Sequence, residues 1–465
     1  MNMINVRRLT VMTFLGAGML SSISAQVSPL QVDTLKETKI PDQWDLQSCI
    51  DYAKEQNITI RKNRITAVST QIDVKTAKAA MFPSLSFSTG QQVVNRPYQE
   101  TSSRVSGSEI ISSNSKTSYN GNYGLNASWT LYNGNKRLKT IQQEKLNNQM
   151  AELDVATSEN NIQESIAQVY IQILYAAESV KVNENTLQVS IAQRDRGQEL
   201  LNAGSIAKSD LAQLEAQVST DRYQLVTAQA TLEDYKLQLK QLLELDGENE
   251  MNIYLPALSD ENVLAPLPTK RDVYISALSL RPEIEASKLN VEASELGINI
   301  AKSSYFPTIS LSAGIGTNHT SGSDFTFGEQ VKNGWNNSIG LSVSVPIFNN
   351  RQTKSAVQKA KLQYETSILS LLDEQKALYK TIESLWLDAN SAQQRYAAAN
   401  EKLKSTQISY ELISEQFNLG MKNTVELLTE KNNLLQAQQE QLQAKYMAIL
   451  NTQLLKFYQG DQLAL

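Results

Sequence analysis

The chain carries the same sequence pattern twice. The segment KAAMFPSLSFSTG begins at Lys78, and the related segment KSSYFPTISLSAG begins at Lys302. The two copies remain in parallel farther along the chain, where Gly204 and Gly420 occupy matching positions. Repetition at about half the chain length indicates two copies of one supersecondary unit, and it constrains the fold more than any single residue does.

Composition narrows the possible functions. The 465 residues include 19 Gly and 10 Pro, which is sparse and predicts long uninterrupted elements. The formal net charge of −5 offers no basic surface for a phosphate backbone, so we expect no nucleic-acid partner. The single His319 and the single Cys49 argue against a zinc cluster, a disulfide and histidine-dependent catalysis. We therefore expect a protein that is not an enzyme, with no catalytic residues, cofactor or metal, and in which Cys49 is a buried apolar residue.

The first 25 residues resemble an export signal. Arg7 and Arg8 precede an apolar run over 9–20, and small residues end at Ala25. A membrane anchor is the alternative, but the run is too short to cross about 30 Å of hydrocarbon as a helix. We predict a signal peptide over residues 1–25.

Two long stretches lack helix breakers. Residues 136–196 and 351–419 contain neither Gly nor Pro, and the second would extend about 100 Å as one helix. Its apolar residues alternate at 4-3 spacing, which predicts left-handed coiled-coil packing, and a second apolar row suggests neighbours on both flanks. A fibrous rod is the alternative. The first pattern includes Leu378, Ile382, Ala389, Tyr396 and Phe417, and the second includes Leu362, Leu369, Leu372 and Leu387. Further helices are expected over 46–81, 205–246, 272–305 and 421–459.

Four short segments alternate apolar and small polar residues with period two. We predict strands over 83–95, 122–133, 307–316 and 337–348. A soluble sandwich would turn the apolar face inward, whereas an outer-membrane barrel turns it toward lipid and lines a water-filled lumen with the polar face. Polar connections over 96–120 and 317–334 favour the barrel, as loops at its outer mouth. Aromatic residues near the strand ends are candidates for interfacial girdles: Trp129, Tyr132, Trp335 and Phe348.

Four strands cannot close a barrel that contains a lumen. Three protomers would supply twelve antiparallel strands and satisfy every backbone group within the hydrocarbon. We therefore expect a homotrimer.

The elements follow the order helix, two strands, long helix, tip turn and return helix, and this order occurs twice. The arrangement resembles the TolC family of trimeric outer-membrane efflux and secretion channels. The most specific marks are FPSLS and FPTIS at the strand entries, and the tip turns NAGSIAKSDL from Asn202 and NLGMKNTVEL from Asn418. The resemblance implies a mainly α fold with a 12-stranded barrel, four strands per protomer, joined to a periplasmic coiled-coil barrel. We assign the first repeat to 40–250, a linker to 251–270 and the second repeat to 271–460.

The tip turns hold candidate gate residues. A left-handed glycine ends a helix readily, and an acid six residues later lies in the first turn of the next helix, where the helix dipole favours it. Asp210 and Glu426 can therefore act as helix caps alone. The resemblance implies more: a latch between the hairpins in which Lys422 is the basic partner of Asp210, and a pore narrowed by Glu426. Phe417 replaces a tyrosine and Thr429 replaces a second acid of the family pattern, which puts one latch hydrogen bond and any cation-binding ring in doubt.

The resemblance implies an outer-membrane channel of a Gram-negative bacterium that extends into the periplasm and passively exports small molecules. Its implied partners are a periplasmic adaptor (membrane fusion) protein that docks near Gly204 and Gly420, a proton-driven or ABC inner-membrane pump, and outer-membrane lipid. Two alternatives stay open: the exit duct of a type I protein secretion system, and a trimeric stalk or adhesin without a pore.

Overall fold

The computed structural model describes residues 41–98, 116–246, 251–256, 263–321 and 325–463, together with the backbone of 102–106 and 109–113. The predicted signal peptide lies outside the described residues. Within the described part, no helix combines the length and the apolar character that a membrane-spanning helix needs.

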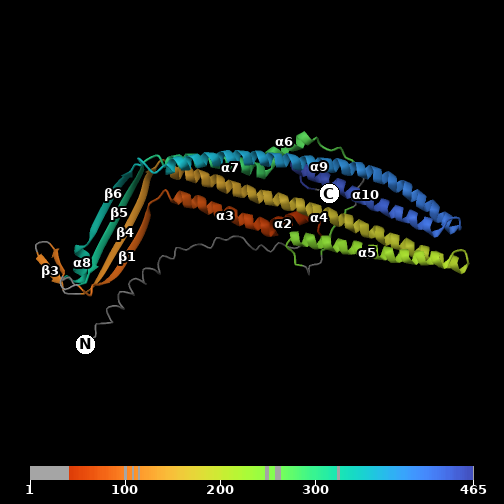
Figure 1. The fold of residues 1–465 in the computed structure, drawn as a ribbon, viewed down its shortest axis with the longest axis horizontal. Helices are drawn as coiled ribbons and strands as arrows, with labels where there is room; N and C mark the ends of the chain where they lie inside the picture. Colours follow the sequence, from red (N-terminus) through yellow and green to blue (C-terminus); the bar gives the residue numbers. More distant parts are fainter. Residues whose placement is uncertain are drawn as a thin grey trace, which may run out of the picture. The chain divides into compact units, whose positions relative to one another are not determined.

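Each repeat folds into two short helices, strands, a long helix and a return helix (Figure 1). In the first repeat these are α2 (Leu46–Gln56), α3 (Ile58–Ala79), β1 (Ser84–Asn95), β4 (Thr117–Asn133), α4 (Lys136–Asn202) and α5 (Lys208–Leu242). In the second they are α6 (Lys270–Leu280), α7 (Pro282–Ser303), β5 (Thr308–Thr320), β6 (Asn336–Ser344), α9 (Gln352–Asn418) and α10 (Thr424–Gln459). Two short strands, β2 (Ser102–Ser106) and β3 (Glu109–Ser113), pair between β1 and β4, and the helix α8 (Phe327–Asn333) lies between β5 and β6.

The continuous helices expected over 46–81 and 272–305 are each broken in two. The first break is at Asn57, whose side chain accepts hydrogen bonds from the amides of Thr59 and Ile60 and starts a new helix. The second is at Arg281, which is extended because the next residue, Pro282, disfavours a helical conformation before it. Both breaks precede the repeated segment by the same number of residues, so the interruption belongs to the repeat.

The long helices form two antiparallel hairpins, α4 with α5 and α9 with α10, and α4 also packs on α10 (Figure 1). Helices α4 and α9 have 67 residues each, which confirms the prediction of elements about 100 Å long. Leu378, Ile382 and Tyr396 of the first heptad pattern are buried, whereas Leu362 of the second is 63% exposed in the single chain. The main core gathers around Trp44, Cys49, Tyr170 and Ile173, and Cys49 is fully buried as expected.

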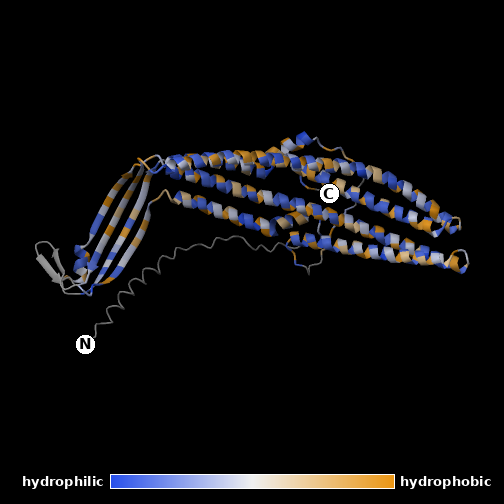
Figure 2. Cartoon of the chain, viewed as in Figure 1, coloured by the Kyte–Doolittle hydropathy of each residue, from blue (hydrophilic) through white to orange (hydrophobic). Residues whose placement is uncertain are grey.

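The sheet has four antiparallel strands in the order β1-β4-β5-β6. Its register brings apolar residues into rows that cross the strands, as the bands in Figure 2 show, and one row pairs Leu85 with Ala127, Ala127 with Ala313 and Ala313 with Ile339. Leu85 is 70% and Ile339 82% exposed, so the described residues leave the apolar face uncovered at these positions. The opposite face carries Ser and Asn side chains, as the alternation predicts.

Strand ends differ from the sequence-based ranges. β6 ends at Ser344 and not at residue 348, because Pro346 has no amide hydrogen to donate to a neighbouring strand. β4 begins at Thr117 and β5 extends to Thr320, so the connections expected over 96–120 and 317–334 are partly strand.

Candidate functional site

The two tip turns, 202–211 and 418–427, have the same backbone geometry. Gly204 and Gly420 have φ angles of +72° and +75°, which confirms the expected left-handed conformation. In the first turn the amide of Ser205 donates to the carbonyl of Leu200 (2.8 Å), and in the second the amide of Met421 donates to the carbonyl of Gln416 (2.9 Å). These bonds satisfy the last carbonyls of α4 and α9 in Schellman motifs, so each hairpin reverses direction with few unpaired backbone groups.

Asp210 caps the return helix of the first hairpin. Its carboxylate accepts a hydrogen bond from the amide of Ala207 at 3.0 Å. Among the described residues it makes no ion pair with Lys422, the partner that the resemblance implied. Within one chain the role that the structure gives Asp210 is therefore the local one.

The second tip turn builds a compact charged cap. Asn423 accepts from the amide of Glu426 (2.9 Å), and Glu426 accepts from the amide of Asn423 (3.2 Å) and from the Lys422 ammonium (2.6 Å). The hydrogen bond from Lys422, followed by that from the Asn423 amide, holds the pKa of the Glu426 carboxyl below its usual value. Lys422 thus neutralises an acid of its own turn in the isolated chain.

The two positions that depart from the family pattern are accounted for locally. Phe417 is 3% exposed, so its ring packs inside the helical part where a hydroxyl would require a partner. Thr429 donates back to the carbonyl of Val425 at 2.8 Å and brings no charge to the turn.

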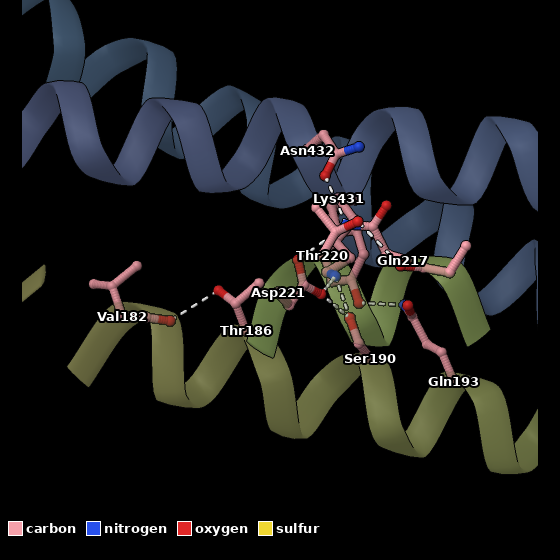
Figure 3. Close-up of polar contacts among 11 residues, drawn as sticks. Val182, Thr186, Ser190, Gln193, Gln217, Thr220, Asp221, Lys431 and Asn432 are labelled. Carbon is pink, nitrogen blue, oxygen red and sulfur yellow. Dashed lines mark hydrogen bonds and ion pairs between the residues drawn. The ribbon is translucent and has the colours of Figure 1, made fainter. Parts of the chain in front are cut away.

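A buried ion pair joins the two hairpins behind these turns, and the sequence reasoning did not identify it. Lys431 of α10 donates to Asp221 of α5 and to Ser190 of α4, and Ser190 also donates to Asp221 (Figure 3). Gln217 donates to the other Asp221 oxygen at 2.9 Å. The side chains of Lys431 and Asp221 are 3% and 1% exposed. We call Lys431, Asp221 and Ser190 the bracket.

The surroundings of Lys431 shift the pKa of its ammonium group. Burial lowers the pKa of the Lys431 ammonium below its usual value, and the hydrogen bond and charge of Asp221 oppose that shift. One turn along α4, Gln193 donates to the Tyr410 hydroxyl of α9 at 2.8 Å. Polar links from the first hairpin therefore reach both helices of the second hairpin.

The sequence did contain a signal for the bracket. Leu427, Lys431 and Leu435 follow one another at core spacing on α10, and both leucines are buried. A lysine within such a row requires a buried acceptor. Its identity, Asp221, depends on how α5 packs and cannot be read from the spacing.

A polar groove adjoins the bracket. It has a volume of about 530 Å³ between α4, α5 and α10, and its lining includes Gln217, Thr220, Tyr223, Asn432 and Gln436. The Tyr223 side chain is 74% exposed at its edge. The groove therefore offers hydrogen-bonding groups beside an exposed aromatic ring.

The girdle candidates lie at both ends of the sheet. Trp129 and Tyr132 are near the end of β4 that leads into α4, and Trp129 donates its indole N–H to the carbonyl of Met81 at 2.8 Å. Phe348 follows β6 at this same end and is 83% exposed. Trp335 precedes β6 at the far end and is 57% exposed.

Known proteins resemble this chain in sequence and fold. The family model described as outer membrane efflux protein matches residues 49–244 and 273–460. Outer membrane efflux protein BepC of Brucella suis is 24% identical over 61% of that protein and 63% of this chain. Outer membrane protein TolC of Escherichia coli is 24% identical over 58% of that protein and 61% of this chain. The matches thus span about six-tenths of these relatives.

Solved structures share the architecture. The structure of CusC has a TM-score of 0.75 at 18% identity and covers 90% of this chain and 92% of that chain. The structure of VceC from Vibrio cholerae has a TM-score of 0.73 at 16% identity and covers 90% of this chain and 97% of that one. The family match includes both repeats, with the strands and both tip turns. The chain belongs to the outer membrane efflux protein family, and the protein lies in the outer membrane of a Gram-negative bacterium and extends into the periplasm.

Proposed function

We propose that the protein is the outer-membrane exit channel and periplasmic tunnel of a tripartite efflux system, and that it passively conducts small molecules. The observation that carries the proposal is the sheet, which exposes an apolar face and continues directly into helices long enough to extend far from the membrane. A polar lumen removes the hydrocarbon barrier for the cargo, and the helical tube separates the cargo from the periplasm. No catalytic step belongs to this proposal.

The channel is a homotrimer in this proposal. β1 and β6 are the edge strands, and each pairs with one neighbour within the chain. An open edge in hydrocarbon leaves backbone groups without hydrogen bonds, so pairing of β1 with β6 of the next copy supports closure into a ring. The exposed row at Leu362 and Leu369 on α9 is available for the same neighbour.

The partners are a periplasmic adaptor and an inner-membrane pump that supplies the energy. An adaptor helix would dock near Gly204 and Gly420, along the groove beside Gln217 and Tyr223. The groove is lined by the carboxamide side chains of Asn and Gln residues, which can form hydrogen bonds with polar side chains of a helix packed in the groove.

The tip turns act as the gate in this proposal. Asp210 lies at the first tip turn, and Lys422, Glu426 and the buried Phe417 lie at the second. A latch between Asp210 and Lys422 would require the Lys422 ammonium to leave Glu426. Glu426 would then narrow the end of the tunnel. Exchange of one ion pair for another provides a closed and an open arrangement of similar energy.

The test is conductance of the purified protein in planar lipid bilayers. We expect discrete conductance steps, and a larger conductance for Lys422→Ala because that change removes the basic latch partner. Lys404→Ala is the matched control, since Lys404 pairs with Glu401 on the surface of α9. Absence of steps would support a stalk or adhesin, and unchanged conductance in Lys422→Ala would refute the latch.

A further inference from the structure

The helix α8 (Phe327–Asn333) lies at the end of the sheet where β5 turns toward β6, which is the end away from the long helices (Figure 1). Its first turn is capped reciprocally: Thr326 accepts from the amide of Glu329 (3.4 Å), and Glu329 accepts from the amide of Thr326 (2.8 Å). This short segment is therefore an ordered part of the connection and has a defined position on the sheet.

Strand register decides which face of the sheet α8 covers. His319 pairs with Gly121, and Ile315 with Leu125, in the ladder between β4 and β5. Since side chains alternate along a strand, His319, Ile315 and Leu125 all lie on the apolar face. Residues of α8 that contact His319 must lie on this face also.

The contacts of His319 hold α8 on the apolar face. The imidazole lies 5.0 Å from the ring of Phe327 and is stacked at 5.9 Å on Tyr123. The imidazole of His319 also lies directly over Gly121. A Cβ atom added at position 121 would come within 2.1 Å of the Cε1 atom of His319. Glycine at position 121 thus creates the space that His319 occupies.

Two hydrogen bonds complete the attachment. Thr317, on the same face as His319, donates its hydroxyl to the carbonyl of Val331 at 2.7 Å. The amide of Thr320 donates to the Gln330 side chain at 2.8 Å. The start of α8, at Phe327, and its second half, at Gln330 and Val331, are therefore fixed to β5.

We propose that α8 is an interfacial helix that lies in the headgroup layer of the outer leaflet and sets the depth of the barrel in the membrane. The occupant is lipid because the face beneath α8 continues, through Leu125 and Ile315, the surface that meets hydrocarbon in the barrel. Phe327 is 45% exposed and the adjoining Trp335 is 57% exposed, as aromatic residues at a membrane interface are. This inference rests on the barrel assembly of the proposed function and assigns α8 to the lipid side of the wall, away from the lumen.

The test is the depth of a nitroxide label in vesicles of phosphatidylethanolamine and phosphatidylglycerol. Gly328→Cys is the labelling site, because a Cβ atom there meets nothing within 4 Å, and the native Cys49 is fully buried. We expect the ratio of oxygen collisions to collisions with a water-soluble nickel chelate to be higher for this label than for a label in water. A label at Met421→Cys in the second tip turn is the control, and it should show the lower ratio expected in water, since Met421 is 70% exposed away from the sheet.

The outcomes separate this inference from the channel proposal. A label at position 328 with a ratio as low as that at position 421 would show a loop in water, and a label that meets neither reagent would show cover by protein; both overturn the inference. Adding Gly121→Val, which displaces His319, should release α8 and move the label into water, while conductance of the same preparation persists. Absence of conductance in the unmutated protein would count against the channel proposal. The depth of the label is measured independently and would still test the position of α8.

Discussion

Replacing Lys431 by methionine is expected to destabilise the protein strongly. The substitution keeps most of the length of the side chain but leaves the Asp221 carboxylate, which is 1% exposed, without its cation. Ser190 and Gln217 would remain as hydrogen-bond donors, but neither carries a charge. Breaking a buried ion pair by removing one partner typically costs about 3–5 kcal/mol.

The cost can be measured as a change in the thermal midpoint of the helical circular dichroism signal. For a chain of this size each kcal/mol shifts Tm by roughly 1 °C, so Lys431→Met should lower Tm by roughly 3–5 °C. The double variant Lys431→Met with Asp221→Leu should recover most of this loss, because a buried ion pair can be replaced by apolar residues at little cost.

An exposed ion pair provides the matched control. Lys402 of α9 pairs with Glu440 of α10 at 2.7 Å, and both side chains are 42% exposed. Lys402→Met should cost at most about 1 kcal/mol, because water and salt screen the pair. Equal losses of Tm in Lys402→Met and Lys431→Met would refute the reasoning, as would a double variant no more stable than Lys431→Met.

The remaining predictions concern the tips and the helix junction. Gly420→Ala should lower stability by about 1–2 kcal/mol because of its positive φ angle, whereas Gly297→Ala within α7 should raise it by about 1 kcal/mol; opposite shifts of Tm test both. Lowering the pH should loosen the second tip turn, because the Glu426 carboxyl has a depressed pKa. Such a group gives stability that is present at neutral pH and is lost as the pH falls through the pKa of the folded state. Conductance should therefore change below about pH 4.5 in the unmutated protein and not in Glu426→Gln. Arg281→Lys should lower Tm by roughly 2 °C, because Arg281 uses two nitrogens to bind Glu164 (2.9 Å) and Glu283 (2.8 Å) and lysine offers one; no change in Tm would show that one contact suffices.

Sequence reasoning predicted those features that depend on local chemistry. The left-handed conformation of Gly204 and Gly420 follows from a glycine placed after a long periodic run, and the strand faces follow from alternation. The helix break before Pro282 was also accessible, because the residue before proline avoids the helical conformation. The break at Asn57 was less accessible, since an asparagine caps a helix only where the chain has already turned.

Features that depend on contacts between distant segments were not predictable. Lys431 finds Asp221 only after α5 and α10 are packed on α4, and no spacing on either helix specifies that pairing. The position of α8 is similar, since His319 reaches Phe327 through the register of β4 and β5. A single sequence gives the periodicity of each element and leaves open which elements meet.

The two apolar patterns of α9 show how the assembly is encoded. Leu378 and Leu362 have the same character in the sequence, yet Leu378 is 6% exposed and Leu362 is 63% exposed. In the proposed trimer the difference arises because only some neighbours of the helix belong to the same chain. Ile339 in the sheet, at 82% exposed, is an apolar residue of the same kind. Some residues fit the periodicity of a core but are left uncovered by one chain, and these residues therefore mark the surfaces where another copy or lipid must pack. A variant such as Leu362→Lys should weaken the assembly before it weakens the fold of one protomer.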